Sequence, residues 1–125
     1  MKEGRERRRS RRRQFDGVVQ VLEHRAGRWD RGVGRDVSSL GMFLTTGSRY
    51  VVGEEVTVRF SLPGGSFEIE VQGRIVRVEG PQDPPHAGVA GVAIEFNEAP
   101  EWAMSEVSRF IREEPGESGA AVIRK

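Results

Sequence analysis

The chain has 125 residues, of which 36% are hydrophobic and 31% are charged, a length and composition typical of one globular domain. It contains no cysteine, which excludes disulfides, a thiol nucleophile and cysteine-based metal sites, and its two histidines are too few and too far apart in sequence to suggest a metal centre. No apolar run is long enough to span a bilayer or to follow the basic start as a secretion signal, so we expect a cytoplasmic protein without membrane insertion.

The net charge of +1 conceals two oppositely charged parts. Residues 1–13, which we call the basic arm, carry eight basic and two acidic groups, a net charge of +6; the rest of the chain carries twelve basic and seventeen acidic groups, a net charge of −5. Six arginines lie within "RRRSRRRQF" at residues 7–15. Such a cluster is a solvated tail, a nonspecific contact for nucleic acid or an anionic membrane, or a defined site for a phosphorylated ligand. Because proteins that bind long nucleic acid usually have a basic body as well, the acidic body favours a small anion and argues against specific nucleic-acid binding.

Alternation of apolar and polar residues after the basic arm predicts β-structure. In "EVTVRFSL" the residues Val56, Val58, Phe60 and Leu62 share one face. The polar segment "WDRGVGRDV" is predicted as an edge strand or a strongly twisted one. The predicted strands are residues 15–23, 29–37, 42–46, 55–62, 66–78 and 91–96. Six short strands joined by turns rich in glycine and proline indicate a small antiparallel barrel or sandwich.

The fifth predicted strand contains an irregularity. Phe67, Ile69 and Val71 are expected on one inward face, and a bulge at Gly73 is expected to shift the phase of residues 75–78. The following segment, residues 80–88, holds three prolines and is predicted to be a loop.

One helix is predicted near the end of the chain. Pro100 is a favourable residue at a helix start, and Glu101 suits the first turn. Four apolar residues then recur at helical spacing and are expected to pack on the strands: Ala103, Val107, Phe110 and Ile111. We expect the helix to end before Pro115 and residues 114–125 to form a flexible tail.

The sequence gives little support for catalysis. Ser38 and Ser39 have no histidine that the sequence assigns to them, and no glycine-rich phosphate loop precedes a helix. The expectation is a protein that is not an enzyme and holds neither a metal nor a resident cofactor.

A second motif changes the interpretation of the arginine cluster. Within "DVSSLG", Asp36, Ser38 and Gly41 form Asp-x-Ser-x-x-Gly between two predicted strands. By itself this pattern also suits an ordinary hairpin loop, in which Asp and Ser bond to nearby backbone and Gly adopts a positive φ.

Both motifs together resemble the PilZ domain, a bacterial receptor module for cyclic di-GMP. That family has Arg-x-x-x-Arg just before its first strand and Asp/Asn-x-Ser-x-x-Gly about two dozen residues later, and both are present here in that order. "GVAIEF" at residues 91–96 is similar to the family's last strand. The resemblance covers roughly residues 6–112 and implies a six-stranded antiparallel β-barrel with a C-terminal α-helix.

Three registers of the arginine motif fit the basic arm: Arg7 with Arg11, Arg8 with Arg12, and Arg9 with Arg13. Family members often have Glu-Arg-Arg, three further residues, an arginine, and a large apolar residue three positions on. "ERRRSRR" followed by "RQF" is similar to this pattern when the pair is Arg8 and Arg12, so we choose these two and keep Arg9 and Arg13 in reserve.

The resemblance also implies roles for the site residues. Arg8 and Arg12 would meet phosphate oxygens or the O6/N7 edge of guanine. Asp36 would repel a phosphate and so should face guanine N–H donors, while Ser38 donates or accepts and Gly41 lets the loop turn and its backbone approach the ligand. An arginine just before the motif goes with a stacked pair of ligands in this family, and Arg7 holds that position.

These expectations define three segments: the basic arm at 1–13, a barrel with its helix at 14–113, and the tail at 114–125. The function implied is a cyclic di-GMP receptor that couples this second messenger to an effector protein. The alternatives are an adaptor of similar fold that acts by protein contact without ligand, for example in motility, and a nonspecific nucleic-acid binder that uses the basic arm.

Overall fold

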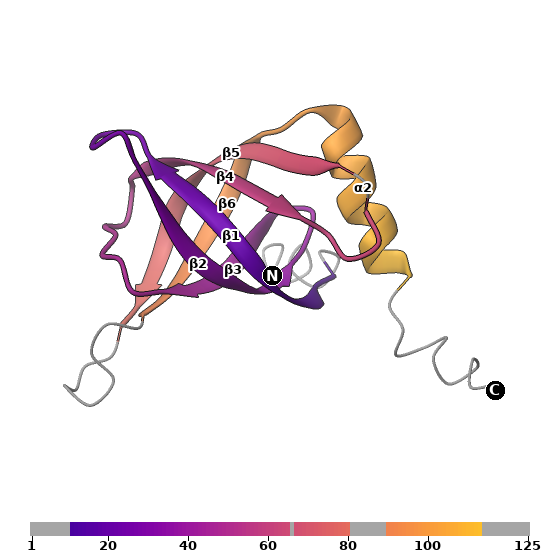
Figure 1. The fold of residues 1–125 in the computed structure, drawn as a ribbon, viewed down its shortest axis with the longest axis horizontal. Coiled ribbons are helices and arrows are strands. Elements are labelled where there is room, and N and C mark those ends of the chain that lie inside the picture. Colours follow the sequence, from indigo (N-terminus) through magenta and orange to yellow (C-terminus); the bar gives the residue numbers. More distant parts are fainter. Residues whose placement is uncertain (1–10, 66, 81–89, 114–125) are drawn as a thin grey trace, which may run out of the picture.

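The computed structural model describes residues 11–65, 67–80 and 90–113, and these form six strands and one helix (Figure 1). The helix is α2, Glu101–Arg112. The strands are β1 Arg13–Glu23, β2 Arg28–Val37, β3 Gly41–Thr46, β4 Glu55–Ser61, β5 Glu68–Glu79 and β6 Ala90–Glu98. The predicted tail and all but Gly80 of the predicted loop at 80–88 lie outside the described residues.

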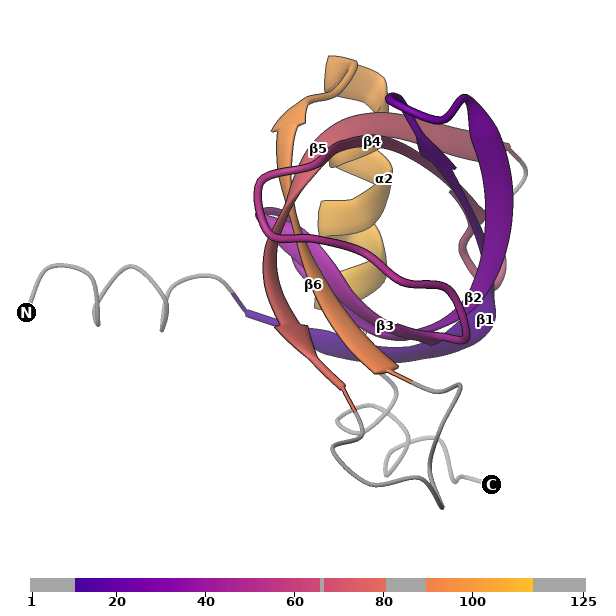
Figure 2. The same ribbon diagram turned by 90° about the vertical axis from the view of Figure 1, so that its left-hand side faces the viewer.

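The six strands close into an antiparallel barrel in the order β1-β2-β3-β6-β5-β4. Its ring is complete because β4 pairs back onto β1, with Val21 opposite Val58 (Figure 2). The predicted six-stranded antiparallel β-barrel with a C-terminal helix is confirmed, and the alternative of a sandwich is excluded. β2 pairs with β1 on one side and β3 on the other, so the prediction that it is an edge strand was wrong.

The polar sequence of β2 has a packing explanation. Two of its buried positions are Gly32 and Gly34. A Cβ atom on Gly34 would lie 2.6 Å from the ring of Phe15, and one on Gly32 would lie 2.9 Å from the side chain of Leu44. Large side chains of neighbouring strands therefore fill the space in front of β2, and the strand contributes backbone rather than side chains to this part of the core.

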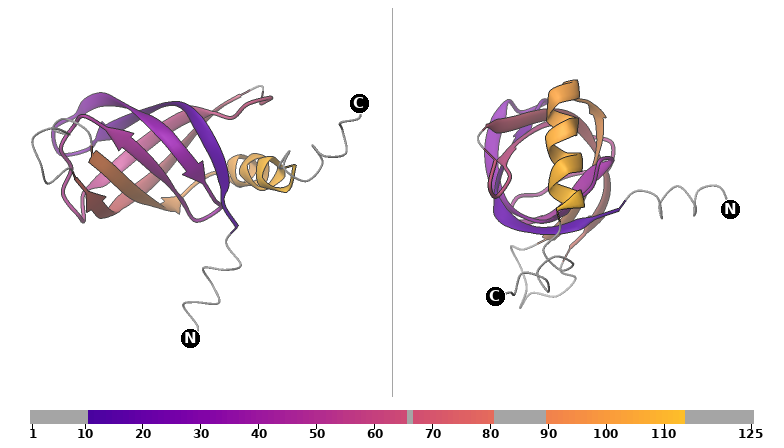
Figure 3. Two further views of the ribbon diagram at one scale, coloured as in Figure 1. Left: turned by 90° about the horizontal axis from the view of Figure 1, so that it is seen from below. Right: turned by 90° about the vertical axis from the view of Figure 1, so that its right-hand side faces the viewer.

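Helix α2 lies across one open end of the barrel (Figures 2 and 3). Pro100 is its N-cap residue, as expected from its place before the helical pattern. The four apolar residues predicted to face the strands are all buried. The ring of Phe110 meets the ring of Phe15 edge-on, with 6.3 Å between their centroids, so α2 continues the barrel core.

Strand β5 departs from its predicted pattern at both ends. Phe67 lies before the strand begins and is 65% exposed, with its ring against Trp102 of α2 instead of the core. The expected irregularity at Gly73 is present in the pairing with β6, but Ile75 stays buried. The phase changes at a second irregularity after Ile75, which leaves Val76 43% exposed and Val78 against the core.

Within the described residues, no helix has the length and apolar character needed to cross a membrane.

Candidate functional site

The two sequence motifs meet at one end of the barrel. Antiparallel pairing places Arg13 opposite Val37, so the residue just before β1 lies beside the end of β2. There the guanidinium of Arg12 donates to the carboxylate of Asp36 across 2.5 Å. These side chains are 56% and 32% exposed, so the ion pair contributes little stability and both groups can rearrange towards a ligand.

The β2–β3 loop, residues 38–40, is held by a small set of hydrogen bonds. The N–H of Ser38 donates to the carbonyl of Gly41 across 2.8 Å, and the N–H of Leu40 donates to Ser38 Oγ across 3.1 Å. The carbonyl of Leu40 in turn accepts from Phe96 of β6. Ser38 is 1% exposed, so its hydroxyl shapes the loop that follows Asp36 in addition to any contact with a ligand.

Gly41 is required for space rather than for an unusual backbone angle. Its φ is not positive; the described glycines with positive φ are Gly27, Gly53 and Gly64. A Cβ on Gly41 would lie 2.2 Å from the carbonyl oxygen of Ile94. Gly41 thus lacks the positive φ of an ordinary hairpin glycine, and close packing of β3 on β6 is the reason for the glycine.

The other arginines of the basic arm have different places. Arg13 lies over the Phe110 ring, with its guanidinium carbon 3.8 Å from the ring centroid, and it donates to the carbonyl of Phe110 across 2.6 Å. Its guanidinium group therefore contacts α2. Arg7, Arg8 and Arg9 lie outside the described residues.

A pocket of about 200 Å³ lies between the end of the basic arm, the β2–β3 loop and α2. Sequence reasoning selected the arm and the loop but missed the helix, because the apolar periodicity of α2 says nothing about which polar residues of its other faces adjoin a loop from β2. The lining residues are Arg11, Ser39, Ser108, Ile111 and Arg112.

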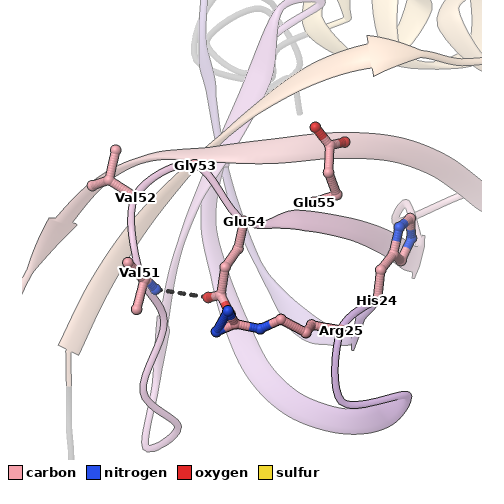
Figure 4. Close-up of a pocket in the computed structure, with 7 residues that line it drawn as sticks. All are labelled: His24, Arg25, Val51, Val52, Gly53, Glu54 and Glu55. Atoms are coloured by element: carbon pink, nitrogen blue, oxygen red, sulfur yellow. Dashed lines mark hydrogen bonds between the residues drawn. The ribbon is translucent and has the colours of Figure 1, made fainter.

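A larger pocket of about 530 Å³ lies at the end of the barrel away from α2, between the β1–β2 turn and the β3–β4 connection (Figures 1 and 4). Its lining includes both basic and acidic side chains and the exposed Val51 and Val52. Glu54 accepts from the N–H of Val51 across 2.7 Å, and the close-up places Arg25 beside it. Since neither motif reaches this end, we take the motif-bearing end as the candidate site.

Glu54, which lines this second pocket, interacts with the carboxyl group of Glu23 at the end of β1. A hydrogen bond with Glu54 raises the pKa of Glu23, and partial burial and the negative charge of Glu54 act in the same direction. Burial opposes ionisation of Glu54, but the hydrogen bond from Glu23, the Val51 N–H and the charge of Arg25 outweigh it and lower the pKa of Glu54.

No group of three or more His, Cys, Asp or Glu side chains placed to hold a metal ion occurs among the described residues. At the motif-bearing end the chemistry is that of arginine and serine donors beside the carboxylate of Asp36. Such an arrangement can bind phosphate through the arginines and N–H groups of a base through the carboxylate.

Solved structures with this fold include those of YcgR, MotI/DgrA and MrkH. The PilZ domain with c-di-GMP of YcgR from Escherichia coli has a TM-score of 0.68 and 14% identity, covering 95% of this chain and 99% of that one. The Bacillus subtilis inhibitor of motility MotI/DgrA has a TM-score of 0.69 and 18% identity, covering 86% of this chain and 50% of that one. The complex of MrkH from K. pneumonia with c-di-GMP has a TM-score of 0.68 and 13% identity, covering 90% and 54%.

The chain thus spans nearly all of the YcgR domain but only about half the length of MotI and MrkH. At these identities the likeness concerns the fold. No curated protein matches the chain. The family model of the PilZ domain matches residues 6–113, which is most of the sequence. The chain therefore belongs to the PilZ domain family.

Proposed function

We propose that this protein is a receptor for cyclic di-GMP that passes the signal to an effector protein and catalyses no reaction. The observation that carries the proposal is the contact between Arg12 and Asp36, which brings the arginine motif and the Asp-x-Ser-x-x-Gly motif together on one surface. Because the ligand is an intracellular nucleotide, we place the receptor in the bacterial cytoplasm.

In this proposal different residues bind different chemical groups of the ligand. Arg12, together with Arg8, binds phosphate oxygens or the guanine O6/N7 edge, and Asp36 turns from Arg12 to the guanine N–H donors. The buried Ser38 and the tightly packed Gly41 hold the β2–β3 loop in place. A preformed loop lowers the ordering cost of binding.

The geometry supports the register of Arg8 with Arg12. In the register of Arg9 with Arg13, the second arginine would have to leave both the ring and the carbonyl of Phe110. In the register of Arg8 with Arg12, Arg12 would only have to give up its partly exposed ion pair with Asp36 in order to contact the ligand. Arg9 and Arg13 stay in reserve.

A second candidate function is an adaptor that acts by protein contact without the ligand. The observation that favours it is an outward aromatic pair: Phe67 and Trp102 are 65% and 47% exposed, with ring centroids 6.1 Å apart. Exposed aromatic side chains are common at the centres of protein interfaces. One of the structural relatives is an inhibitor of motility, which is a role of this general kind.

Calorimetric titration separates these functions. The receptor predicts saturable binding of cyclic di-GMP, much weaker binding of GMP and no specific binding of a DNA duplex. The ligand-independent adaptor predicts no binding of any of the three. Comparable binding of the duplex and of cyclic di-GMP, both abolished by moderate salt, would instead indicate a nonspecific nucleic-acid contact through the basic arm.

A further inference from the structure

Helix α2 contributes to the pocket that adjoins the two motifs. Ser108, Ile111 and Arg112 are three and four residues apart and therefore lie on one face of the helix. They line the pocket together with Arg11 of the basic arm and Ser39 of the β2–β3 loop. The start of β1 lies beside the C-terminal end of α2 in both views of Figure 3, in agreement with the contact between Arg13 and Phe110.

The chemistry of this pocket suits an anion. Its lining holds two guanidinium groups, from Arg11 and Arg112, and two hydroxyl groups, from Ser39 and Ser108, and it includes no carboxylate. Arginine bonds phosphate through two parallel N–H groups, and serine adds an O–H donor. The volume of about 200 Å³ is below the ~300–1,000 Å³ of pockets that enclose whole ligands, so it suits one phosphate group of a larger molecule.

Two arginines in the last turn of α2 differ in their surroundings. Both can interact favourably with the negative end of the helix dipole. Arg109 forms an ion pair with Glu106, one turn back. Arg112 is exposed and forms no ion pair with any described residue, and it alone of the two lines the pocket. The helix dipole favours a cation at both positions and so does not explain the difference between them. Only Arg112 lines the pocket, which points to a role in binding.

We propose that Arg112, with Ser108, binds a phosphate of the nucleotide, so that α2 is itself part of the ligand site. This inference rests on the proposed function and extends it to residues outside both motifs. The rest of the ligand would extend over Arg12 and Asp36. Binding would then connect α2 with the basic arm and the β2–β3 loop, and would give the helix a direct part in the response to the ligand.

The test compares Arg112→Gln with the matched control Arg109→Gln in calorimetric titrations with cyclic di-GMP. Both variants remove one cation from the last turn of α2, so we expect similar small changes in their melting temperatures. We expect Arg112→Gln to weaken binding by about tenfold to a hundredfold, the effect of losing a charge-assisted hydrogen bond, and Arg109→Gln to bind within about twofold of the wild type. Ser108→Ala, a milder change on the same face, should weaken binding by about twofold to tenfold.

The outcomes separate this inference from the function on which it rests. If the wild type binds, Arg12→Ala weakens binding, and both Arg112→Gln and Ser108→Ala bind as the wild type does, the role of α2 is refuted and the receptor stands. If the wild type itself fails to bind cyclic di-GMP, the proposed function is refuted and this inference with it. Equal losses of affinity in Arg109→Gln and Arg112→Gln would also refute the role of α2, because the effect would then come from the lost positive charge on the helix and not from a contact with the ligand.

Discussion

Gly41 and Ser38 show how single residues of the second motif act through packing. The backbone of Gly41 lies so close to β6 that a methyl group would overlap the carbonyl of Ile94. Ser38 is buried and its hydroxyl accepts from the backbone of the loop it begins. Part of the motif therefore builds the loop, and Asp36, whose side chain is 32% exposed, is the member that we propose to contact the ligand.

We expect Gly41→Ala to destabilise the barrel by about 1–3 kcal/mol, the usual cost of forcing an extra group into a packed site. Leu40→Ala, at a neighbouring side chain that is 55% exposed, should change the free energy of unfolding by no more than about 0.5 kcal/mol. Urea denaturation of the two variants provides the comparison. Equal stability of Gly41→Ala and the wild type would show that β3 and β6 can separate at this point without cost.

At this scale the sequence predicted which residues form the motifs, but not why each is needed. The sequence suggested that Gly41 lets the loop turn and its backbone approach a ligand. The structure shows a different need, because β6, which is remote in sequence, leaves no room for a side chain. Likewise, Arg12 and Arg13 are adjacent and chemically identical, and only the structure separates the one that meets Asp36 from the one that meets Phe110.

Between elements, Arg13 joins the start of β1 to the end of α2. Its guanidinium bonds a carbonyl in the last turn of the helix, where backbone acceptors lack helical partners, and it covers the Phe110 ring. This contact gives the helix a second attachment to the barrel besides its apolar face.

Replacement of Arg13 by Ala should lower the free energy of unfolding by about 1–2 kcal/mol, through the lost hydrogen bond and cation–π contact. Amide hydrogen exchange in the last turns of α2 should become faster. The affinity for cyclic di-GMP should change little, because Arg13 is not the arginine that faces Asp36. A loss of affinity as large as that in Arg12→Ala would instead favour the register of Arg9 with Arg13.

The carboxyl pair between β1 and the β3–β4 connection predicts a dependence on pH. Because the pKa of Glu23 is raised, its stabilising contribution is present at low pH and is lost as pH rises through that pKa. The contribution of Glu54, whose pKa is lowered, is present at higher pH and is lost as pH falls. Glu23→Gln keeps a hydrogen-bond donor for Glu54 without a proton that can be lost.

We therefore expect Glu23→Gln to melt at a higher temperature than the wild type at pH 7 and at nearly the same temperature near pH 4.5, the ordinary value for this carboxyl. Glu55→Gln, on the adjoining strand, serves as the control for removing one negative charge. If Glu23→Gln were less stable than the wild type at pH 7, the raised pKa of Glu23 would be contradicted.

At the scale of the whole molecule, the basic arm and the acidic body suggest how many ligands bind. Two stacked cyclic di-GMP molecules bring four phosphates together, and their repulsion requires additional positive charge. Arg7 would provide a further guanidinium beside the proposed pair, which matters because the rest of the chain carries a net charge of −5.

We predict about two ligands per chain at saturation and weaker binding as salt concentration rises. Arg7→Leu should reduce the stoichiometry to one. Calorimetric titration to saturation measures the stoichiometry of the wild type and of Arg7→Leu. A stoichiometry of one in the wild type, unchanged in Arg7→Leu, would refute the stacked pair.

Much of the overall fold could be predicted from local patterns. Alternation in residues such as Val56, Val58 and Phe60 identified strands, and helical spacing identified the buried face of α2. Local patterns did not show that the barrel closes; the resemblance of the two motifs to the PilZ family implied it. The packing of Phe15 against Gly34 was not predicted, because it depends on contact between separate strands. The exposure of Phe67 has the same origin, because Trp102 provides an outside surface for its ring.

The central claim is that Arg12 and Asp36 together form a cyclic di-GMP site, and calorimetric titration of Arg12→Ala and Asp36→Ala tests it most directly. Each change should weaken binding by about tenfold to a hundredfold without unfolding the domain, since both side chains are partly exposed. Arg35→Ala, which removes a similarly exposed arginine paired with Asp16, should bind as the wild type does. Wild-type affinity in both Arg12→Ala and Asp36→Ala would contradict the claim.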